Sequence, residues 1–457
     1  MNIGKKDVLW GYISLLLVQG INVILLPVIV RYLNSAELGV WYTFTSLYGL
    51  AMLIDFGFQT IITRNISYLW SGAQSIKSIG FEVVGDIDKK INLPYFIKVL
   101  SAVRFIYTSM GGIIFILFIT AGTWYMVNIN DGEISMQTML ISWLFYMLSI
   151  VLNISFSYWN SVLKGIGAIK VYNQILIATK STQLVLSIVF LILNLGLIGV
   201  SLAYFVSVIV NRILQSIAYY NYSKETKKTK RKLKITYDKE ILKNLLPNTL
   251  RTGSLSISNY LIINFPIILS SYFLSLKVSG QFGFINQIVT LIIMLSNSYY
   301  NTYLAKLNYL RVKNKYDELI QLFKKAILTS SIFNIIAFTL FILLGNWALR
   351  IIGADYRLLS LIPLLIIIIY RFLYNIQILF TNFLSTKNLI PHHKSFLISA
   401  IITILIQIVL LKFIDNRLIY LLLPLLLVQL IHNNWYWIWY VIKDIKKDKN
   451  LYQSTQI

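Results

Sequence analysis

Residues 221–251 read NYSKETKKTKRKLKITYDKEILKNLLPNTLR, and this stretch divides the chain into two apolar halves. It holds ten Lys or Arg residues and three acidic ones, Glu225, Asp238 and Glu240. Basic residues beside membrane spans remain on the cytoplasmic side of a membrane protein. The stretch therefore predicts a cytoplasmic linker between two membrane-embedded halves. The predicted segments are 1–220, a linker at 221–249, 250–442, and a cytoplasmic tail at 443–457.

Composition places the chain in a membrane. Hydrophobic residues make up 57% of the 457 residues and charged ones 13%, unlike an ordinary soluble domain. The net charge of +24 does not indicate a nucleic-acid partner, because the basic residues lie at the ends of apolar runs, where membrane lipid and topology account for them. There is no Cys, and His392, His393 and His432 are too few for a zinc site, so we predict no metal and no other cofactor.

Twelve apolar runs are long enough for a spanning helix, which needs about 20 mostly apolar residues. The first follows Lys5 and Lys6 and is too long for the core of a signal peptide, so we expect it to be retained. The runs predict an all-α polytopic membrane protein. The predicted spans are 10–30, 38–62, 103–124, 135–158, 171–193, 197–219, 250–273, 282–304, 327–344, 359–384, 395–413 and 418–441.

The placement of charge agrees with twelve spans. If the N-terminus is cytoplasmic, 32 of the 41 Lys and Arg fall in cytoplasmic segments or at their edges, including the predicted loops 63–102 and 305–326. Both termini are therefore predicted to be cytoplasmic. The aromatic residues at 435–440 end the last span where an interfacial belt is expected.

Two short matches indicate that the halves are repeats. Pro27 in the first span corresponds to Pro266 in the seventh, and residues 36–39 (AELG) correspond to 280–283 (GQFG). Internal repeats are common in secondary transporters, with the substrate site where the repeats meet. We therefore expect two six-helix bundles around a central cavity.

Charged residues at bilayer depth are costly unless they face protein or water, so they mark candidate sites. Lys180 and Arg371 lie near the middle of the fifth and tenth predicted spans, and Arg212 lies in the sixth. Asp55 is the one acid available at that depth. The interior is therefore predicted to be net cationic and to attract an anion, with arginine forks suited to phosphate oxygens.

Three further arginines near span ends, Arg31, Arg64 and Arg251, are also candidates for substrate contact. Anchoring of the topology is an equally good explanation for each of them. The cations in the interior also have an alternative explanation. Lys180 and Arg371 would have a structural role if each paired with a buried carboxylate. An Arg212 side chain that extended to the interface would also carry no substrate role.

Polar side chains form stripes along several predicted spans, each on one helix face at about 100° per residue. The polar side chains of the stripes in both halves can all find partners if they surround a polar lumen. The alternative is that Asn, Ser and Thr side chains only form hydrogen bonds from one helix to another. Asn153 and Asn297 are the amides predicted to contact substrate. The stripes comprise Ser142, Ser149, Asn153 and Asn160; Asn173, Lys180, Gln183, Ser187 and Asn194; Asn286, Thr290, Asn297 and Asn301; and Arg371, Asn375 and Asn382.

Asp55 shares one face of the second span with Trp41, Tyr48 and Gln59. Aromatic and amide side chains suit sugars, and a carboxylate in a cavity can bind and release a proton or a sodium ion. We hypothesise that Asp55 couples transport to such an ion. The alternative is that it pairs with Arg64 or another base.

Residues 22–64 read NVILLPVIVRYLNSAELGVWYTFTSLYGLAMLIDFGFQTIITR. They resemble the Wzx-type flippases of bacterial polysaccharide export, in the superfamily that includes the multidrug-and-toxin extruders (MATE). The resemblance implies a MATE-like pair of bundles and alternating-access export of an undecaprenyl-pyrophosphate-linked oligosaccharide, such as an O-antigen unit for lipopolysaccharide, to the periplasmic leaflet. It also implies a bacterial inner membrane, and we expect the protein to act as a monomer. The features that carry the resemblance are Pro27, Arg31, Glu37-Leu38-Gly39, Asp55-Phe56-Gly57 and Arg64.

Two other functions were weighed against a flippase. A multidrug cation antiporter of the same fold would carry several intramembrane carboxylates and few cations, which is the reverse of this pattern. A membrane glycosyltransferase or polymerase needs a sizeable catalytic module, whereas the external loops are short and the linker is a run of lysines. The external acidic pair in Asp131-Gly132-Glu133 is interpreted as a solvated turn. We therefore predict that the protein is not an enzyme.

Overall fold

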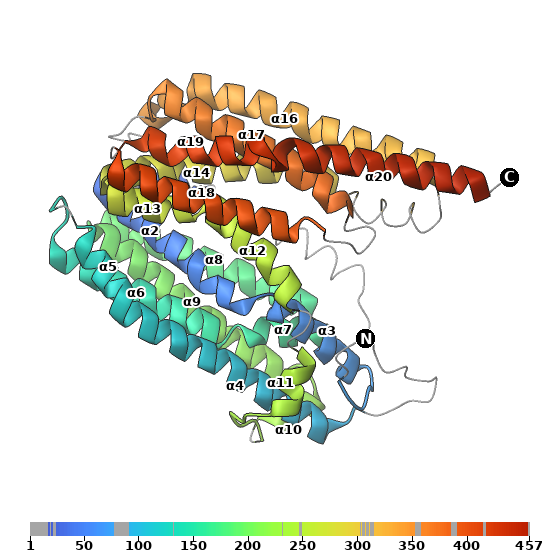
Figure 1. Ribbon diagram of the computed structural model, residues 1–457. Helices are drawn as coiled ribbons and strands as arrows, with labels where there is room; N and C mark the ends of the chain where they lie inside the picture. The colour runs from blue at the N-terminus through green and yellow to red at the C-terminus, as the bar shows by residue number, and fades with distance from the viewer. Residues whose placement is uncertain are drawn as a thin grey trace. The chain divides into compact units, whose positions relative to one another are not determined.

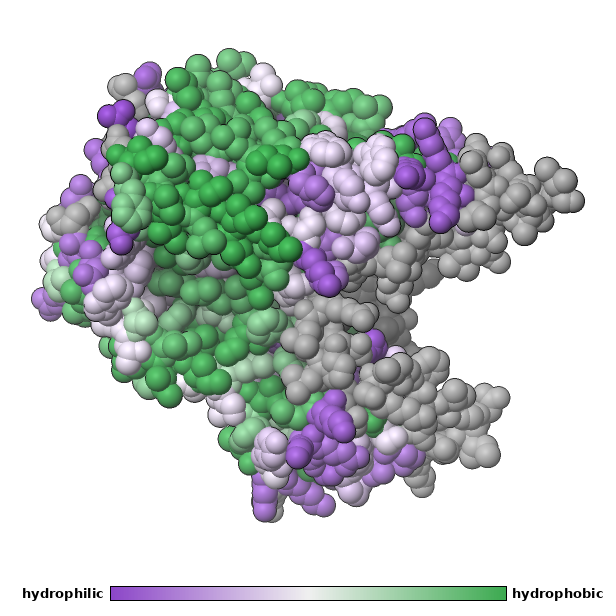
Figure 2. Space-filling model, viewed as in Figure 1, coloured by the Kyte–Doolittle hydropathy of each residue, from purple (hydrophilic) through white to green (hydrophobic). Residues whose placement is uncertain are grey.

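The computed structural model describes residues 17–18, 20–21, 24–76, 91–130, 132–230, 232–245, 249–301, 303, 307, 310, 315–351, 358–384, 391–414 and 417–455. Within these ranges, ten helices are long and apolar enough to cross a membrane. In Figure 2, hydrophobic side chains cover the middle parts of the helices, and hydrophilic ones gather near α10 and α11 and along the C-terminal part of α20. The chain is therefore a multi-pass membrane protein, as its composition predicts.

The chain divides into two compact units, with helices α2 and α12 contributing to both (Figure 1). Unit 1 contains the described residues of Met1–Glu37 and Leu47–Ser256, and unit 2 those of Leu38–Ser46 and Ile257–Ile457. The grouping of six spans in each half stays a prediction. The first elements are α2 (Ser35–Met52), η1 (Leu53–Asp55), α3 (Phe58–Trp70), α4 (Leu93–Leu117), η2 (Phe118–Gly122), α5 (Thr123–Asn128), α6 (Met136–Ser155), α7 (Tyr158–Gly165), α8 (Ile169–Ile192), α9 (Gly196–Tyr220), α10 (Lys224–Thr229) and α11 (Lys239–Leu245). The remaining elements are α12 (Thr249–Ile263), α13 (Phe265–Phe273), α14 (Leu276–Ser296), α16 (Tyr316–Ile351), α17 (Leu361–Leu384), α18 (His393–Phe413), α19 (Leu418–Ile431) and α20 (Asn433–Thr455).

Ten of the twelve predicted spans, those from 103–124 onward, coincide with the ten long apolar helices. The first, 10–30, lies partly outside the described residues, and its end belongs to a helical segment at 24–32. The second, 38–62, is helical but broken between η1 and α3. Hydropathy thus located the spans, since apolar length is what a bilayer selects.

Several predicted boundaries are wrong because helices continue past the apolar run that revealed them. Helix α4 begins at Leu93 rather than 103, and α16 runs for 36 residues from Tyr316 instead of covering only 327–344. Much of the predicted loops 63–102 and 305–326 is therefore helical. The predicted tail is also helical as far as Thr455. Hydropathy detects only the part of a helix inside lipid, and these extensions are amphipathic.

Two predicted spans contain backbone breaks. Phe56 and Gly57 both adopt the left-handed conformation, with φ of 43° and 84°, and so separate α2 and η1 from α3. The seventh span breaks at Asn264, and Pro266 lies in the first turn of α13. The carbonyl oxygen of Asn264 accepts a hydrogen bond from Ser46 Oγ at 2.6 Å. Discontinuous helices require such partners because lipid supplies none.

The two glycines that the repeat places in equivalent positions lie at one packing interface of unit 2. A Cβ added at Gly39 of α2 would lie 1.9 Å from the backbone oxygen of Leu276, at the start of α14. A Cβ at Gly283 of α14 would lie 2.5 Å from the Cβ of Tyr42. Each motif glycine therefore allows its helix to approach the other helix closely.

Glu37, in the same motif, accepts hydrogen bonds from backbone N–H groups at the starts of two helices in unit 1. Its carboxylate accepts the backbone N–H of Asn34 at 3.1 Å, and Asn34 Oδ1 accepts the N–H of Glu37 at 2.9 Å, which forms a capping box for α2. The other carboxylate oxygen accepts the Leu197 N–H at 3.3 Å, in the first turn of α9. One acidic side chain thus satisfies free donors of two helices.

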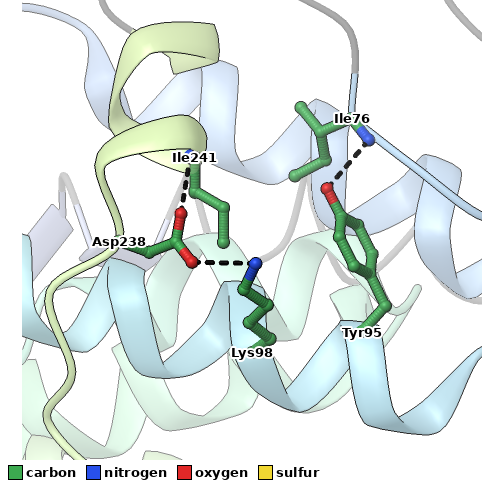
Figure 3. A network of polar contacts seen from close by, with 5 residues as sticks. All are labelled: Ile76, Tyr95, Lys98, Asp238 and Ile241. Carbon is green, nitrogen blue, oxygen red and sulfur yellow. Dashed lines mark hydrogen bonds and ion pairs between the residues drawn. The ribbon is translucent and has the colours of Figure 1, made fainter.

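The basic linker is a docked structure rather than the unstructured run of lysines that we predicted. Its Asp238 carboxylate lies 2.9 Å from Lys98 Nζ of α4 and accepts the Ile241 N–H at 3.0 Å (Figure 3). The Ile241 N–H and the Lys98 ammonium hold the pKa of Asp238 below its usual value. Lys234 N–H also donates to Ser101 Oγ at 3.4 Å. Sequence periodicity did not reveal this docking because its partners lie more than 100 residues away.

Candidate functional site

Arg371 is the most deeply buried candidate. It lies on α17 of unit 2 with 3% of its surface exposed. Its Nη2 donates to the Thr290 hydroxyl of α14 at 2.7 Å, whereas Nε and Nη1 have no hydrogen-bond partner among the described residues. No carboxylate in the described ranges pairs with Arg371. This part of the structure therefore does not show the structural ion pair that was the alternative. A buried guanidinium with unused donors is costly without a further partner.

Amide and phenol groups surround Arg371 on three helices of unit 2. Asn375 of α17 and Asn297, the C-cap residue of α14, exchange two hydrogen bonds, at 2.7 and 3.2 Å. Tyr374 donates its hydroxyl to Asn259 of α12 at 2.5 Å. Thr290 and Asn297 of the stripe predicted on the eighth span therefore face α17, whereas Asn286 donates to the Ile263 carbonyl of α12. These members bond one helix to another, which is one of the two interpretations given for such stripes.

Arg212 of α9 lies at the centre of a second polar cluster, in unit 1. Its guanidinium donates to the side chain and, at 3.0 Å, the backbone oxygen of Asn153, and to Gln215 Oε1 at 2.9 Å. Asn153 in turn donates to the Tyr48 hydroxyl at 3.1 Å, and Gln215 donates to Asn160 at 2.6 Å. Arg212 thus points toward α6 and is held by hydrogen bonds within unit 1.

Lys180 is half-buried on α8, and its Nζ donates to Gln183 of the next turn at 2.9 Å. Three other members of the predicted stripe, Asn173, Gln183 and Ser187, are buried in unit 1, whereas Asn194 is exposed just after α8 ends. Helices α8 and α9 pack along their length (Figure 1). Lys180 has no carboxylate partner in the described residues, so its charge is held by neutral groups.

Asp55 accepts a hydrogen bond from the Tyr107 hydroxyl of α4 at 2.7 Å and from the Gln59 N–H at 3.3 Å. Arg64 is exposed on α3 and makes no ion pair with a described residue, so the alternative of an Asp55–Arg64 pair is wrong. The carboxylate therefore lies beside the break at Phe56 with neutral partners only. Such a group can take up a proton or a small cation without losing an ion pair.

The remaining candidates lie apart from both clusters. Arg31 is exposed, 5.8 Å from the centroid of the Tyr32 ring. Arg31 and Arg64 form no side-chain hydrogen bond with another described residue, which favours the anchoring role for both. Arg251 lies on α12, but its side chain is outside the described part, as is Asp131. The structure shows no group of three or more metal-ligating His, Cys, Asp or Glu residues within the described ranges.

Sequence analysis missed Tyr107 and Arg104, both on α4. Tyr107 is fully buried beside Asp55, but no spacing rule links residues 52 positions apart on different helices. Arg104 lies one residue inside the third predicted span, 103–124, and was not considered as a candidate. With α4 beginning at Leu93, Arg104 lies three turns inside a helix. The signal that could have revealed this extension of α4 was an amphipathic pattern ahead of the apolar run at 103–124.

No protein-family model and no curated protein sequence matches this chain. Solved structures do match over nearly the whole length. An inward-facing multidrug resistance MATE family transporter of the MOP superfamily matches with 12% identity and a TM-score of 0.72, over 94% of this chain and 96% of that one. The MATE multidrug transporter DinF-BH matches with 15% identity and a TM-score of 0.58, over 99% of this chain and 98% of that one.

A third match is a MOP superfamily transporter from Pyrococcus furiosus, described as having a binding pocket of reverse polarity that suggests a different function. It has 13% identity and a TM-score of 0.53, over 98% of this chain and 97% of that one. At these identities the comparisons show the fold. The chain thus has the all-helical MATE transporter fold predicted for it.

Proposed function

We propose that this protein is a flippase that moves an undecaprenyl-pyrophosphate-linked oligosaccharide across a bacterial inner membrane by alternating access. The observation that carries the proposal is Arg371, a 3% exposed guanidinium with two donor nitrogens that no described residue satisfies. Its partner Thr290 is itself exposed at the surface of unit 2. An anion that reached this position would find a charged, preorganised donor.

Charge balance supports an anionic cargo over a cationic one. Arg371, Arg212 and Lys180 are all held by neutral groups, whereas Asp55 is the one acid among the described candidate residues. Each cation costs several kcal/mol at bilayer depth unless it is compensated. A pyrophosphate brings compensation with it, and Arg binds phosphate oxygens in a fixed fork.

Unit 1 adds groups that suit a glycan. The Tyr48 hydroxyl bonds Asn153, and the Tyr146 and Tyr204 rings stack with centroids 5.0 Å apart. Tyr48 meets Tyr204 edge-on at 6.4 Å. Aromatic faces beside amides pack against sugar rings and bond their hydroxyls. In the proposal this cluster holds the oligosaccharide while the polyprenyl tail stays in lipid.

A multidrug cation antiporter is the second candidate. It is favoured by one observation: the Asp55 carboxylate bonds Tyr107 and has no cationic partner among the described residues, so it would equally bind a cationic drug. Similarity to MATE multidrug transporters agrees with this candidate. Both candidates place the termini in the cytoplasm and need no cofactor or enzymatic step.

Reconstitution into lipid vesicles separates the two candidates. We expect the purified protein to move a fluorescent polyprenyl-pyrophosphate-linked sugar between leaflets, measured as its exposure to an external lectin, and to leave a cationic dye untransported. Gradient-driven movement of the dye without exposure of the glycolipid would reject the flippase and favour the antiporter. Protein-free vesicles supply the baseline for both readings.

Replacing Asp55 with Asn is expected to remove the dependence of transport on an ion gradient. The amide keeps an oxygen that can accept from Tyr107 but cannot bind a proton or hold a charge near neutral pH. Transport with and without a proton or sodium gradient measures the effect. Glu240→Gln is the control, since Glu240 is an exposed acid on α11. Full gradient-dependent rates in the Asp55 variant would dismiss the coupling role.

A further inference from the structure

Unit 1 contains a pocket of about 420 Å³ where α6 ends and α7 begins. Side chains of α4, α6, α7 and α9 line it. One of them, Arg212, lies eight residues before the end of α9 at Tyr220, which is about 12 Å along the helix. The pocket is therefore near the end of α9 that leads into the basic linker.

The pocket walls are cationic. Arg104 of α4 and Arg212 of α9 both line it, and none of the lining residues is acidic. The side chain of Arg104 makes no hydrogen bond or ion pair with another described residue. Arg212 uses both of its terminal nitrogens within the polar cluster, but its buried Nε has no partner there. Two guanidinium groups thus retain unused donors beside one cavity.

Aromatic residues with free polar ends complete the wall. Tyr158 and Trp159 of α7 pack with ring centroids 4.7 Å apart, and Trp159 meets Tyr220 of α9 at 5.7 Å. The two tyrosine hydroxyls and the indole N–H have no hydrogen-bond partner among the described residues. Lys230 of the linker lies 5.7 Å from the centroid of the Tyr220 ring. Tyr and Trp are the residues that occupy the headgroup level of membrane proteins.

The pocket also has an apolar side. Ile213 and Ile217, one turn apart on α9, line it while 52% and 51% of their surfaces remain exposed. Exposed apolar residues on a spanning helix face lipid. A molecule with an acyl or polyprenyl chain can therefore lie along α9 while its polar head occupies the pocket.

We propose that this pocket binds the phosphate group of a lipid headgroup, with Arg104 as its principal ligand and the Tyr158, Trp159 and Tyr220 donors around it. The ligand is either a phospholipid of the bilayer or the phosphorylated end of a polyprenyl lipid, which share this chemistry. The inference does not require transport, because it depends only on the donors of one pocket in unit 1. It would stand if the flippase proposal failed.

Native mass spectrometry of the full-length protein released from phosphatidylcholine nanodiscs tests the proposal. The nanodiscs carry either phosphatidylglycerol or undecaprenyl pyrophosphate at increasing mole fraction, and the bound lipid is counted. Arg104→Gln is expected to weaken binding of at least one of these lipids by about tenfold, the loss of a charge-assisted contact. Arg104→Lys, which keeps the charge without the fork, is expected to recover part of the loss.

Lys243→Gln is the matched control, because Lys243 is exposed on α11 of the same unit and loses the same charge. Thermal unfolding of each variant checks that it is folded. A loss confined to the polyprenyl lipid assigns the pocket to a transported head, and a loss that includes phosphatidylglycerol assigns it to bilayer phospholipid as well. Binding of both lipids by folded Arg104→Gln at the level of Lys243→Gln would overturn the proposal.

Discussion

Replacing Arg371 with Met is expected to lower transport of the lipid-linked oligosaccharide at least about 100-fold while raising the thermal stability of the protein. The transport loss follows from two donors, Nε and Nη1, that no described residue satisfies and that the proposed ligand would bind. At about 1.5 kcal/mol or more for each charge-assisted bond, the loss reaches about 3 kcal/mol, or two decades of rate or affinity. The stability gain follows because Met fills similar volume without a buried charge.

The opposite signs of these two effects separate a ligand-binding role from a structural one. Transport is measured in vesicles, and unfolding by fluorescence-detected size exclusion after heating. Arg371→Lys keeps the charge but not the fork and should retain intermediate transport. Arg350→Gln, at an exposed position of α16, is the control. A lower unfolding temperature with normal transport in Arg371→Met would mean that Arg371 only holds α17 against α14.

Replacing Gly39 with Ala is expected to prevent the protein from accumulating in a folded form. The new Cβ would lie 1.9 Å from the backbone oxygen of Leu276, and a backbone atom cannot move aside as the end of a side chain can. Overpacking in a well-packed interior costs about 1–3 kcal/mol, and occasionally more. We expect at least the upper end here, seen as loss of the monodisperse peak in fluorescence-detected size exclusion.

Gly112→Ala is the matched control for Gly39→Ala, since Gly112 lies in helix α4 with nothing within 4 Å of an added Cβ. It should be neutral or should stabilise the protein by about 0.5–1 kcal/mol, the usual preference of a helix for Ala. Gly283→Ala, which meets the Tyr42 side chain, should fall between the two. Equal yields of Gly39→Ala and Gly112→Ala would show that α2 and α14 tolerate a wider separation.

Much of the fold followed from the sequence because bilayer thickness imposes a length that composition reveals. The spans from 103–124 onward were predicted from apolar length, whereas the break near Pro266 was not predicted. What failed was the description of polar segments. The linker was interpreted as unstructured because its lysines dominate, yet one acid, Asp238, docks it to Lys98 of α4.

The candidate site was predictable one helix at a time but not across helices. Helical spacing grouped Asn375 with Arg371 on one span, and Thr290 with Asn297 on another. It could not show that Asn297 and Asn375 bond each other, or that Tyr107 holds Asp55. Those pairings depend on which helix faces packed together, and a single sequence contains no direct record of that.

The bonds that join α17 to its neighbours determine how unit 2 can deform. The Asn375 and Asn297 amides each donate one hydrogen bond to the other. A shift of α17 along α14 by one helical turn, about 5.4 Å, would therefore break both hydrogen bonds at once. Tyr374 adds a tie to α12 through Asn259. These three helices should therefore translate as one rigid body, and strain should concentrate at Asn264, where the backbone is already interrupted before α13.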